Sequence, residues 1–312
     1  MKKPWLAYAL ITTGFWGVWG AFAEFPTRHG FPETLVYVVW ALTLIPPALY
    51  AMQRAGWRVL RDPKSIVLGS LIGLTGAGGQ MLLFHAVHTG PTYLIFPIIA
   101  LSPVITIALS MLFLKERVTK VGALGVALAL IALPLFNYSP GAEADAASAI
   151  AGAVSAGASV LQGVTWFLYA LIILLAWGVQ AYFMKLANGT MDAENIFLYM
   201  TLTGLALIPV ALWMTDFGVH IEYGWQGPGL AAITQILNAV GALTLVYAFR
   251  YGRALVVAPL ANAGAPMITA VVSMIVLGAV PNAITIAAIA LASLAAALLA
   301  IEPEEKLIEQ PI

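Results

Sequence analysis

Polar and aromatic side chains that recur inside long apolar runs are the residues of this chain best suited to bind a ligand. Two groups fall on single faces at helical spacing. They are Thr12, Trp16, Trp19, Gly20 and Glu24 in one run, and Tyr169, Trp177, Gln180 and Lys185 in another. Indoles offer stacking surfaces and amides offer hydrogen bonds, so each group could line a cavity. The alternative for the indoles is an aromatic belt at the membrane surface. Trp16 and Trp177 lie half-way along their runs, which favours the cavity.

Amide side chains supply a second set of candidates. Gln80, Gln235, Asn238 and Asn262 lie within apolar runs, where an amide facing lipid is costly. They therefore face a cavity or hydrogen-bond to a neighbouring helix, and both interpretations stay open. The candidate cavity residues are Thr12, Trp16, Trp19, Gln80, Tyr169, Trp177, Gln180, Gln235, Asn238 and Asn262.

Groups that would support catalysis, a metal or a cofactor are not found in the sequence. There is no Cys, and the four His (His29, His85, His88 and His220) are scattered. Neither His-Glu-x-x-His nor Gly-x-Ser-x-Gly occurs, and no Gly-x-x-x-x-Gly-Lys loop would bind a nucleotide. We therefore expect no enzyme activity and no cofactor. The zero net charge also gives no basic field for nucleic acid.

Glu24 could be a proton-coupling acid or a solvated residue at the rim. By helical rise it lies roughly 28 Å from Trp5, near a membrane surface. A carboxylate there is inexpensive, so we predict a rim residue. His85 and His88 are interpreted in the same way.

Prolines interrupt two of the runs at corresponding places. They are Pro97 and Pro103 in one run and Pro259 and Pro266 in the other. Each proline frees a carbonyl one turn earlier, which is tolerated where the backbone lines a cavity or finds a neighbour. Paired interruptions indicate a binding site, while a simple packing kink is the alternative.

The composition requires a lipid environment for these runs. Of 312 residues, 62% are hydrophobic and 9% charged, with a mean hydropathy of +0.94. Runs of about 20 apolar residues predict membrane helices. Ten are predicted, at 5–24, 33–52, 66–86, 92–114, 119–137, 163–184, 194–214, 228–249, 255–278 and 282–301. The first run resembles a cleaved signal peptide, but a motif within it recurs later, which favours a retained span.

Basic residues predict the orientation of the ten spans. With a cytoplasmic N-terminus, thirteen Lys and Arg fall in inside segments and only Arg28 falls outside. This bias predicts an inner-membrane protein with both termini in the cytoplasm. It also predicts an extracytoplasmic linker at 138–162 and a cytoplasmic tail at 302–312.

The two halves of the chain resemble each other. Phe15–Glu24 aligns with Ala176–Lys185, matching Trp16 to Trp177 and Gly17 to Gly178. "SPVITIALSMLFL" aligns with "APMITAVVSMIVL", matching among others Thr106 to Thr269. Five spans in each half make the second copy cross the membrane in the opposite sense. Such inverted repeats, here 1–137 and 163–301, are typical of transporters with a shared midplane site.

The sequences "FWGVWG", "LFLKERVT" and "YAFRYGRALVVAPL" resemble the drug/metabolite transporter superfamily, in its EamA-like branch. The resemblance covers nearly the whole chain as two five-span units. It implies eight helices around a central cavity, with the last helix of each half outside. Its most specific mark is Lys115-Glu116-Arg117, and the second copy departs from it with Gly278-Ala279-Val280.

These features predict a secondary transporter that works by alternating access. No charged residue occurs from Ser65 to Leu114, which favours a small neutral, zwitterionic or amphipathic metabolite or drug. The expected partners are this solute and the lipid bilayer, and both a monomer and a homodimer stay open. The alternative is a membrane scaffold without transport activity, or a lipid flippase subunit. The sequence does not indicate the substrate, the coupling ion or the direction of transport.

Overall fold

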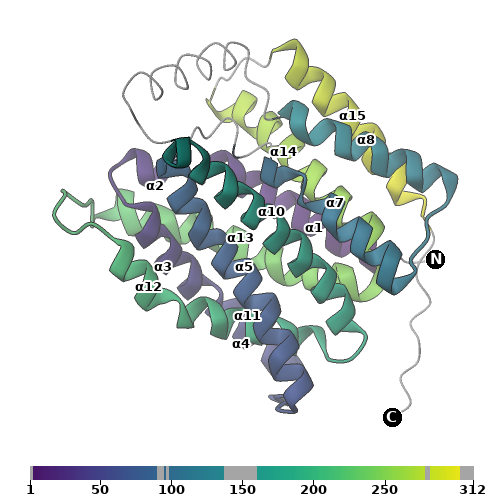
Figure 1. The fold of residues 1–312 in the computed structure, drawn as a ribbon, viewed down its shortest axis with the longest axis horizontal. Helices are drawn as coiled ribbons and strands as arrows, with labels where there is room; N and C mark the ends of the chain where they lie inside the picture. The colour runs from purple at the N-terminus through teal and green to yellow at the C-terminus, as the bar shows by residue number, and fades with distance from the viewer. Residues whose placement is uncertain (1–2, 90–94, 96–97, 137–159, 278–281, 303–312) are drawn as a thin grey trace.

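The computed structural model describes residues 3–89, 95, 98–136, 160–277 and 282–302. Among these, the side chains of 84, 85, 87–89, 160–164 and 277 are not described. The described chain consists of helices and connecting segments without a strand (Figure 1). The helices are α1 (Pro4–Phe22), α2 (Phe25–Arg28), α3 (Glu33–Thr43), α4 (Ile45–Arg54), α5 (Pro63–Thr89), α7 (Ser102–Leu109), α8 (Lys120–Phe136), α10 (Val160–Asn188), α11 (Ala193–Ala206), α12 (Ile208–Met214), α13 (Leu230–Tyr251), α14 (Ala254–Leu277) and α15 (Ala283–Ala300). Two π-helical turns, η1 (Ser110–Leu114) and η2 (Trp225–Gly229), extend α7 and precede α13.

Eight helical stretches of the described chain are long and apolar enough to cross a membrane. They are Pro4–Arg28, Glu33–Arg54, Pro63–Leu83, Thr165–Asn188, Ala193–Met214, Trp225–Tyr251, Ala254–Val276 and Ala283–Ala300. The prediction of an all-α, multi-pass membrane protein is therefore confirmed. The predicted spans at 92–114 and 119–137 coincide with two shorter apolar helical stretches, Ile98–Leu114 and Lys120–Phe136. In the predicted linker, 138–159 lie outside the described residues and 160–162 belong to α10.

Prolines divide two of the spans into pairs of helices, which the sequence analysis did not predict. α3 ends and α4 begins at Leu44, with Pro46 in the first turn of α4. α11 ends and α12 begins at Leu207, with Pro209 in the first turn of α12. Proline has no N–H to donate to the preceding turn, so each helix is interrupted there.

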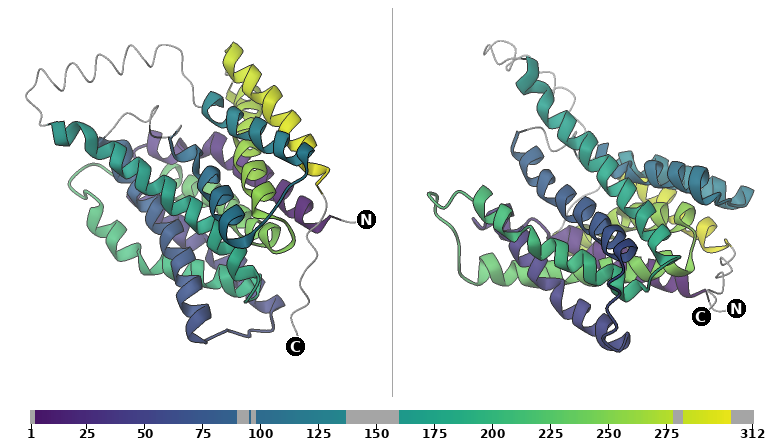
Figure 2. Two further views of the ribbon diagram at one scale, coloured as in Figure 1. Left: turned by 45° about the vertical axis from the view of Figure 1, so that its right-hand side comes forward. Right: turned by 60° about the horizontal axis from the view of Figure 1, so that its bottom comes forward.

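The long helices form a ring. Around it, α14 contacts α1, α1 contacts α13, α13 contacts α3, and α3 contacts α12. The ring continues from α11 to α5, from α5 to α10, from α10 to α7, and from α7 back to α14. α8 and α15 pack on each other and on α14, and they lie side by side at one edge of the bundle in both views of Figure 2. The position of α8 and α15 agrees with the resemblance, which implies that the last helix of each half lies outside.

Small residues join α8 to α15. Ala129 and Ala132 of α8 are fully buried against Ala292 and Ala295 of α15. Without long side chains between them, the two backbones approach closely and gain van der Waals contact.

The first and last residues that the structure describes, Lys3 and Glu302, meet at one end of the bundle, which we call the terminal end. The Lys3 ammonium donates hydrogen bonds to the carbonyl oxygens of Ala300 (2.7 Å) and Glu302 (2.8 Å), at the C-terminus of α15. The Glu302 carboxylate is buried and accepts hydrogen bonds from the backbone N–H and hydroxyl of Thr119. Arg253 lies 3.5 Å from the same carboxylate. The start of α8, the start of α14 and the end of α15 are thereby joined.

Glu116 of the Lys115-Glu116-Arg117 sequence caps the N-terminus of α14 at this end of the bundle. Its carboxylate accepts hydrogen bonds from the backbone N–H groups of Ala254 and Leu255, both at 3.1 Å. These N–H groups belong to the first turn of α14 and have no intrahelical partner, so a carboxylate stabilises them. Residues 278–281, where the second copy departs from this sequence, lie outside the described residues.

Asp62 and Ser65 start α5 in a similar way. The Asp62 carboxylate accepts a hydrogen bond from the Ser65 backbone N–H at 3.0 Å. Hydrogen bonding from the Ser65 side chain and backbone lowers the pKa of the exposed Asp62 carboxyl below its usual value.

Candidate functional site

Three indoles and two amides meet where α1, α3 and α13 adjoin. Trp40 Nε1 donates to Asn238 Oδ1 at 2.8 Å, and Trp19 Nε1 donates to Gln235 Oε1 at 3.2 Å. Trp16 Nε1 donates to the backbone carbonyl oxygen of Asn238 at 3.2 Å. Gln235 is buried, and the other four side chains are half-buried. We call these five residues the indole–amide cluster.

A glycine allows the approach of α1 to α13 at this cluster. A Cβ atom on Gly241 would lie 2.4 Å from the Trp16 ring, closer than real Cβ contacts. The indole of Trp16 therefore lies directly against the α13 backbone, and this places its Nε1 within reach of Asn238.

Thr12, another predicted cavity residue, is fully buried between helices. Its hydroxyl lies 2.8 Å from the Thr244 hydroxyl and donates within 3.2 Å to the carbonyl oxygens of Tyr8 and Gly241. The structure thus shows Thr12 joining α1 to α13.

Trp40 is the cluster member that the sequence analysis missed. It lies near the middle of the 33–52 run, at the depth that singled out Trp16 and Trp177. The same criterion would have identified it. No helical-face pattern in its own run drew attention to it, and its contact with Asn238 joins segments 198 positions apart.

A related but less connected group lies where α5 of the first half meets α10 of the second. Trp177 Nε1 donates to the carbonyl oxygen of Gly76 at 3.3 Å. A Cβ atom on Gly76 would lie 2.1 Å from the Gln180 amide, so Gln180 lies against the α5 backbone. Tyr169 and Trp177 pack against the same apolar cluster of α5 and α10, and Gln80 is half-buried on α5.

The remaining predicted site residues lie on α7 and α14 or outside the described chain. Asn262 Nδ2 donates to the Ala258 carbonyl oxygen at 2.9 Å, one turn earlier in α14. Pro259 and Pro266 lie inside α14, and Pro266 removes the N–H that would bond the Asn262 carbonyl. Pro103 stands in the first turn of α7, after a break at Leu101. Pro97 lies outside the described residues.

Matched hydrogen bonds join each half of the chain to the other. Thr106 Oγ1 of α7 donates to the carbonyl oxygen of Gly178 on α10 at 3.0 Å. Thr269 Oγ1 of α14 donates to the carbonyl oxygen of Gly17 on α1 at 2.8 Å. All four residues belong to the segments that align in the sequence repeat.

Lys185 and Glu24, which also align, behave differently. Lys185 Nζ donates to the carbonyl oxygens of Phe249 (3.2 Å) and Gly252 (2.8 Å), at the C-terminus of α13. A cation is favourable at this end of a helix, and it draws α10 against α13. Glu24 has a side chain that is 71% exposed and pairs with Arg28 at 2.8 Å. In the repeat, α1, α5 and α7 are the counterparts of α10, α13 and α14. Within the described chain α10 contacts both α13 and α14, whereas no contacts of similar extent join α1 to α5 or to α7.

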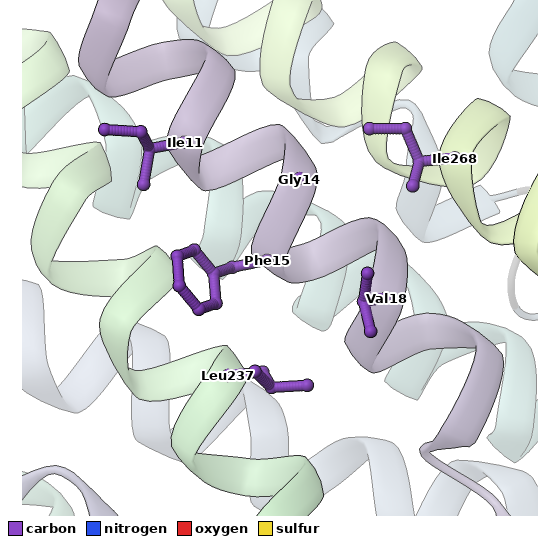
Figure 3. Close-up of a pocket in the computed structure, with 6 residues that line it drawn as sticks. All are labelled: Ile11, Gly14, Phe15, Val18, Leu237 and Ile268. Carbon is purple, nitrogen blue, oxygen red and sulfur yellow. The ribbon is translucent and has the colours of Figure 1, made fainter.

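Two of the hollows formed by described residues lie beside α1. One is open, has a volume of about 360 Å³ and is lined by Ile11, Gly14, Phe15, Val18, Leu237 and Ile268. Figure 3 shows Phe15 extending toward α13, which carries Leu237, while Ile268 comes from α14 on the other side of α1. The smaller, of about 200 Å³, is lined by Gly20, Ala21, Glu24, Phe25, Arg28 and Ser273. The predicted cavity residues line neither hollow, so their role in ligand binding stays a prediction.

The described residues offer little for catalysis or metal binding. No group of three or more His, Asp or Glu that could hold a metal ion occurs among them. The indole–amide cluster can supply hydrogen bonds and aromatic surface to a solute, without a fixed charge.

Comparison with known proteins gives matches in both halves. Residues 3–138 and 164–301 each match the model of the EamA-like transporter family. Protein RarD of Streptomyces exfoliatus is 24% identical over 278 residues, which cover 84% of this chain and 76% of RarD. An uncharacterized protein of Methanocaldococcus jannaschii is 31% identical over 81 residues, which cover 26% of this chain and 59% of that protein. A protein of known crystal structure shares the fold, with a TM-score of 0.71 and 17% identity over 94% of this chain and 95% of that one.

Proposed function

This chain belongs to the EamA-like transporter family, and from that premise we propose that it is a secondary transporter of small organic solutes. The proposed solute is a neutral, zwitterionic or amphipathic metabolite or drug. It would cross the inner membrane by alternating access through the ring of helices.

The proposal includes ten spans arranged as two inverted repeats. The two family matches, 3–138 and 164–301, support the duplication. The matched hydrogen bonds of Thr106 and Thr269 support an equivalent packing of the two copies. The bonds from Lys3 to Ala300 and Glu302 keep both chain ends on one side, which requires an even number of crossings. We propose that this side is the cytoplasm, as the basic residues predict.

The single observation that carries the transport mechanism is the contrast between Lys185 and Glu24. Lys185 closes α10 against α13 at the terminal end, whereas Glu24, its counterpart, is exposed and pairs with Arg28. Two equivalent half-structures that differ in this way correspond to a carrier closed at one end and open at the other. Exchange of these roles would open the interior to the other side.

The character of the interior supports an uncharged or zwitterionic solute. The indole–amide cluster contains no ionisable side chain, and its polar groups are indole N–H and amide groups. A solute with a high net charge would find no fixed counter-charge there, and an unpaired charge inside a membrane is costly.

Flux into proteoliposomes tests the proposal. Purified full-length protein is reconstituted into empty vesicles, and uptake is measured for a radiolabelled panel of neutral amino acids and for an amphipathic fluorescent dye. We expect uptake of at least one solute above that of protein-free vesicles, saturable and competed by the unlabelled compound. Absence of flux in either direction, with other membrane proteins co-purifying, would favour the scaffold or flippase-subunit alternative.

Reporter fusions test the inverted arrangement separately. A reporter that is active only outside the cytoplasm, inserted in the 138–162 segment, should be active, and one fused after 302 should be inactive. A cytoplasmic location of 138–162 would contradict the proposed five-span repeat.

A further inference from the structure

The indole–amide cluster fixes the orientation of two amide groups. An indole Nε1–H can only donate, so the atom that it contacts must be an acceptor. Trp40 therefore contacts the oxygen of the Asn238 amide, and Trp19 contacts the oxygen of the Gln235 amide. Each NH2 group is consequently directed away from its indole, and rotation of either amide would place two donors face to face.

The two amide nitrogens have no acceptor within the described part of the chain. Gln235 and Asn238 take part there only in the hydrogen bonds from Trp16, Trp19 and Trp40, which use carbonyl oxygens. Gln235 is only 4% exposed as a residue, and Asn238 is half-buried. Neither NH2 nitrogen is among the fully enclosed polar atoms of the described chain that have no partner, so a small molecule can reach both nitrogens. Both residues lie in α13, inside the apolar stretch Trp225–Tyr251, where an NH2 group gains by finding an acceptor in water or in a ligand.

We propose that the amide nitrogens of Asn238 and Gln235 form a donor face that binds acceptor oxygens of the transported solute, a carboxylate fitting best. This inference rests on the proposed transport function and specifies which group of the solute binds here. Hydrogen bonds to a charged acceptor are about twice as strong as those between neutral groups, so a carboxylate gains most. An ammonium group would be repelled by the NH2 donors of this face, and its remaining acceptor would be the second lone pair of each amide oxygen, beside the indole N–H.

Trp40 and Trp19 act in this arrangement as positioning residues. They hold the amide orientation through their N–H groups, and this effect is separate from the bulk of their rings. Trp213 provides a comparison outside the site, because its side chain is 85% exposed on α12 and is not part of the cluster. Removing the N–H of Trp40 should therefore change the choice between acceptor and donor ligands, and removing that of Trp213 should not.

Binding of two matched probes tests the donor face. 3-Phenylpropionate and 2-phenylethylamine share a ring and a two-carbon chain, and one ends in a carboxylate acceptor while the other ends in an ammonium donor. The Kd of each is measured by titration with the purified full-length protein in detergent. We expect the wild type to bind the carboxylate more tightly by about tenfold, the effect of one hydrogen bond to a charged group. Equal affinities, tighter binding of the amine, or no binding of either probe at millimolar concentration would overturn the proposal.

Three variants separate orientation from bulk. Asn238→Asp replaces the NH2 group by an acceptor of the same shape, so the preference should reverse toward the amine. Trp40→Phe keeps an aromatic ring but frees the Asn238 amide to rotate, so the ratio of the two Kd values should fall toward one. Trp213→Phe should leave that ratio as in the wild type. A ratio unchanged in Trp40→Phe, or altered equally in Trp213→Phe, would refute the positioning role even if Asn238→Asp does not fold.

Failure of this inference differs from failure of the proposed transport. Binding is measured without flux, so a protein that prefers the carboxylate but moves no solute would contradict transport and leave the donor face intact. A protein that transports solutes without this preference would contradict the donor face and leave the transport proposal intact.

Discussion

Thr106 and Thr269, 163 positions apart, make the same hydrogen bond to two glycines that are 161 positions apart. Thr106 Oγ1 donates to the Gly178 carbonyl oxygen, and Thr269 Oγ1 donates to the Gly17 carbonyl oxygen. In both places the glycine brings two helix backbones into contact. A Cβ atom on Gly17 would lie 2.4 Å from Ile268, and one on Gly178 would lie 2.5 Å from Ile105. The threonine and the glycine thus act together to join α14 to α1 and α7 to α10.

Alanine at either glycine should separate these helices. For Gly17→Ala and Gly178→Ala we expect a loss of about 1–3 kcal/mol in the free energy of unfolding, the usual effect of overpacking. The measurement is reversible unfolding in detergent micelles. Gly14→Ala is the control, because a Cβ there meets nothing within 4 Å, and helix propensity should make it neutral or stabilising. Equal destabilisation by all three changes would contradict the close approach.

The sequence repeat predicted where the two halves match, because Trp-Gly and Pro-x-Ile-Thr are recognisable at fixed spacing. Glycine within an apolar run indicates close packing without naming the partner, so the contacts of Gly17 with Ile268 and of Gly178 with Ile105 required the structure. The divisions of two spans at Leu44 and Leu207 were also missed. Prolines in the first turn of a helix and prolines inside one look alike in sequence, and the tertiary contacts decide between them.

Among the candidate site residues, the sequence analysis selected Gln235 and Asn238 as amides that need partners inside the membrane, and in the structure both accept hydrogen bonds from indoles. It could not distinguish a cavity from contacts between helices, because both satisfy an amide. Thr12 illustrates the difficulty, since it is fully buried and hydrogen-bonded to α13. Trp40 could have been selected as a candidate, because it lies near the middle of its span. Its hydrogen bond to Asn238 joins distant segments, however, and such a contact leaves no local pattern in the sequence.

Gln180→Ala should reduce transport without loss of folded protein. Its amide makes no hydrogen bond to the described chain, so its removal leaves no buried partner unsatisfied. We expect uptake at low solute concentration to fall about three- to tenfold, as for one lost neutral hydrogen bond. The measurements are initial uptake rate and elution as a single folded species. Gln53→Ala, at an exposed position of α4, is the control. Loss of folded protein with Gln180→Ala would identify this residue as a packing group.

Trp177→Ala should also lower transport, although it tests binding less cleanly. The ring lies against Gly79 and donates to the Gly76 carbonyl oxygen, so truncation also leaves a cavity. Removal of a fully buried Trp costs about 3–5 kcal/mol, and we expect a smaller loss here because Trp177 is half-buried. The uptake rate must therefore be expressed per amount of folded protein, and an unchanged rate on that scale would remove Trp177 from the candidate site.

Glu24→Gln should leave any pH dependence of transport unchanged. The carboxylate is 71% exposed and pairs with Arg28 within the same surface turn, so it lies in contact with solvent and not with the interior of the bundle. The measurement is the uptake rate between pH 5.5 and 8.5, roughly the range in which an activated carboxyl or a histidine would titrate. A pH profile that becomes flat in Glu24→Gln would show that Glu24 carries the coupled proton.

Lys185→Met should favour opening of the terminal end. The ammonium group donates to the carbonyl oxygens of Phe249 and Gly252. Loss of such charge-assisted bonds costs about 1.5–3 kcal/mol. A change of this size shifts the equilibrium between the closed and open forms of the terminal end about tenfold or more. The chain has no Cys, so a single cysteine introduced at Ala181, one turn before Lys185, reports access without background. We expect a membrane-impermeant maleimide to label it about tenfold faster from the terminal side in Lys185→Met. Glu24→Met is the matched control and should not change this rate. Equal labelling in the wild type and in Lys185→Met would show that the Lys185 bonds do not hold the terminal end closed.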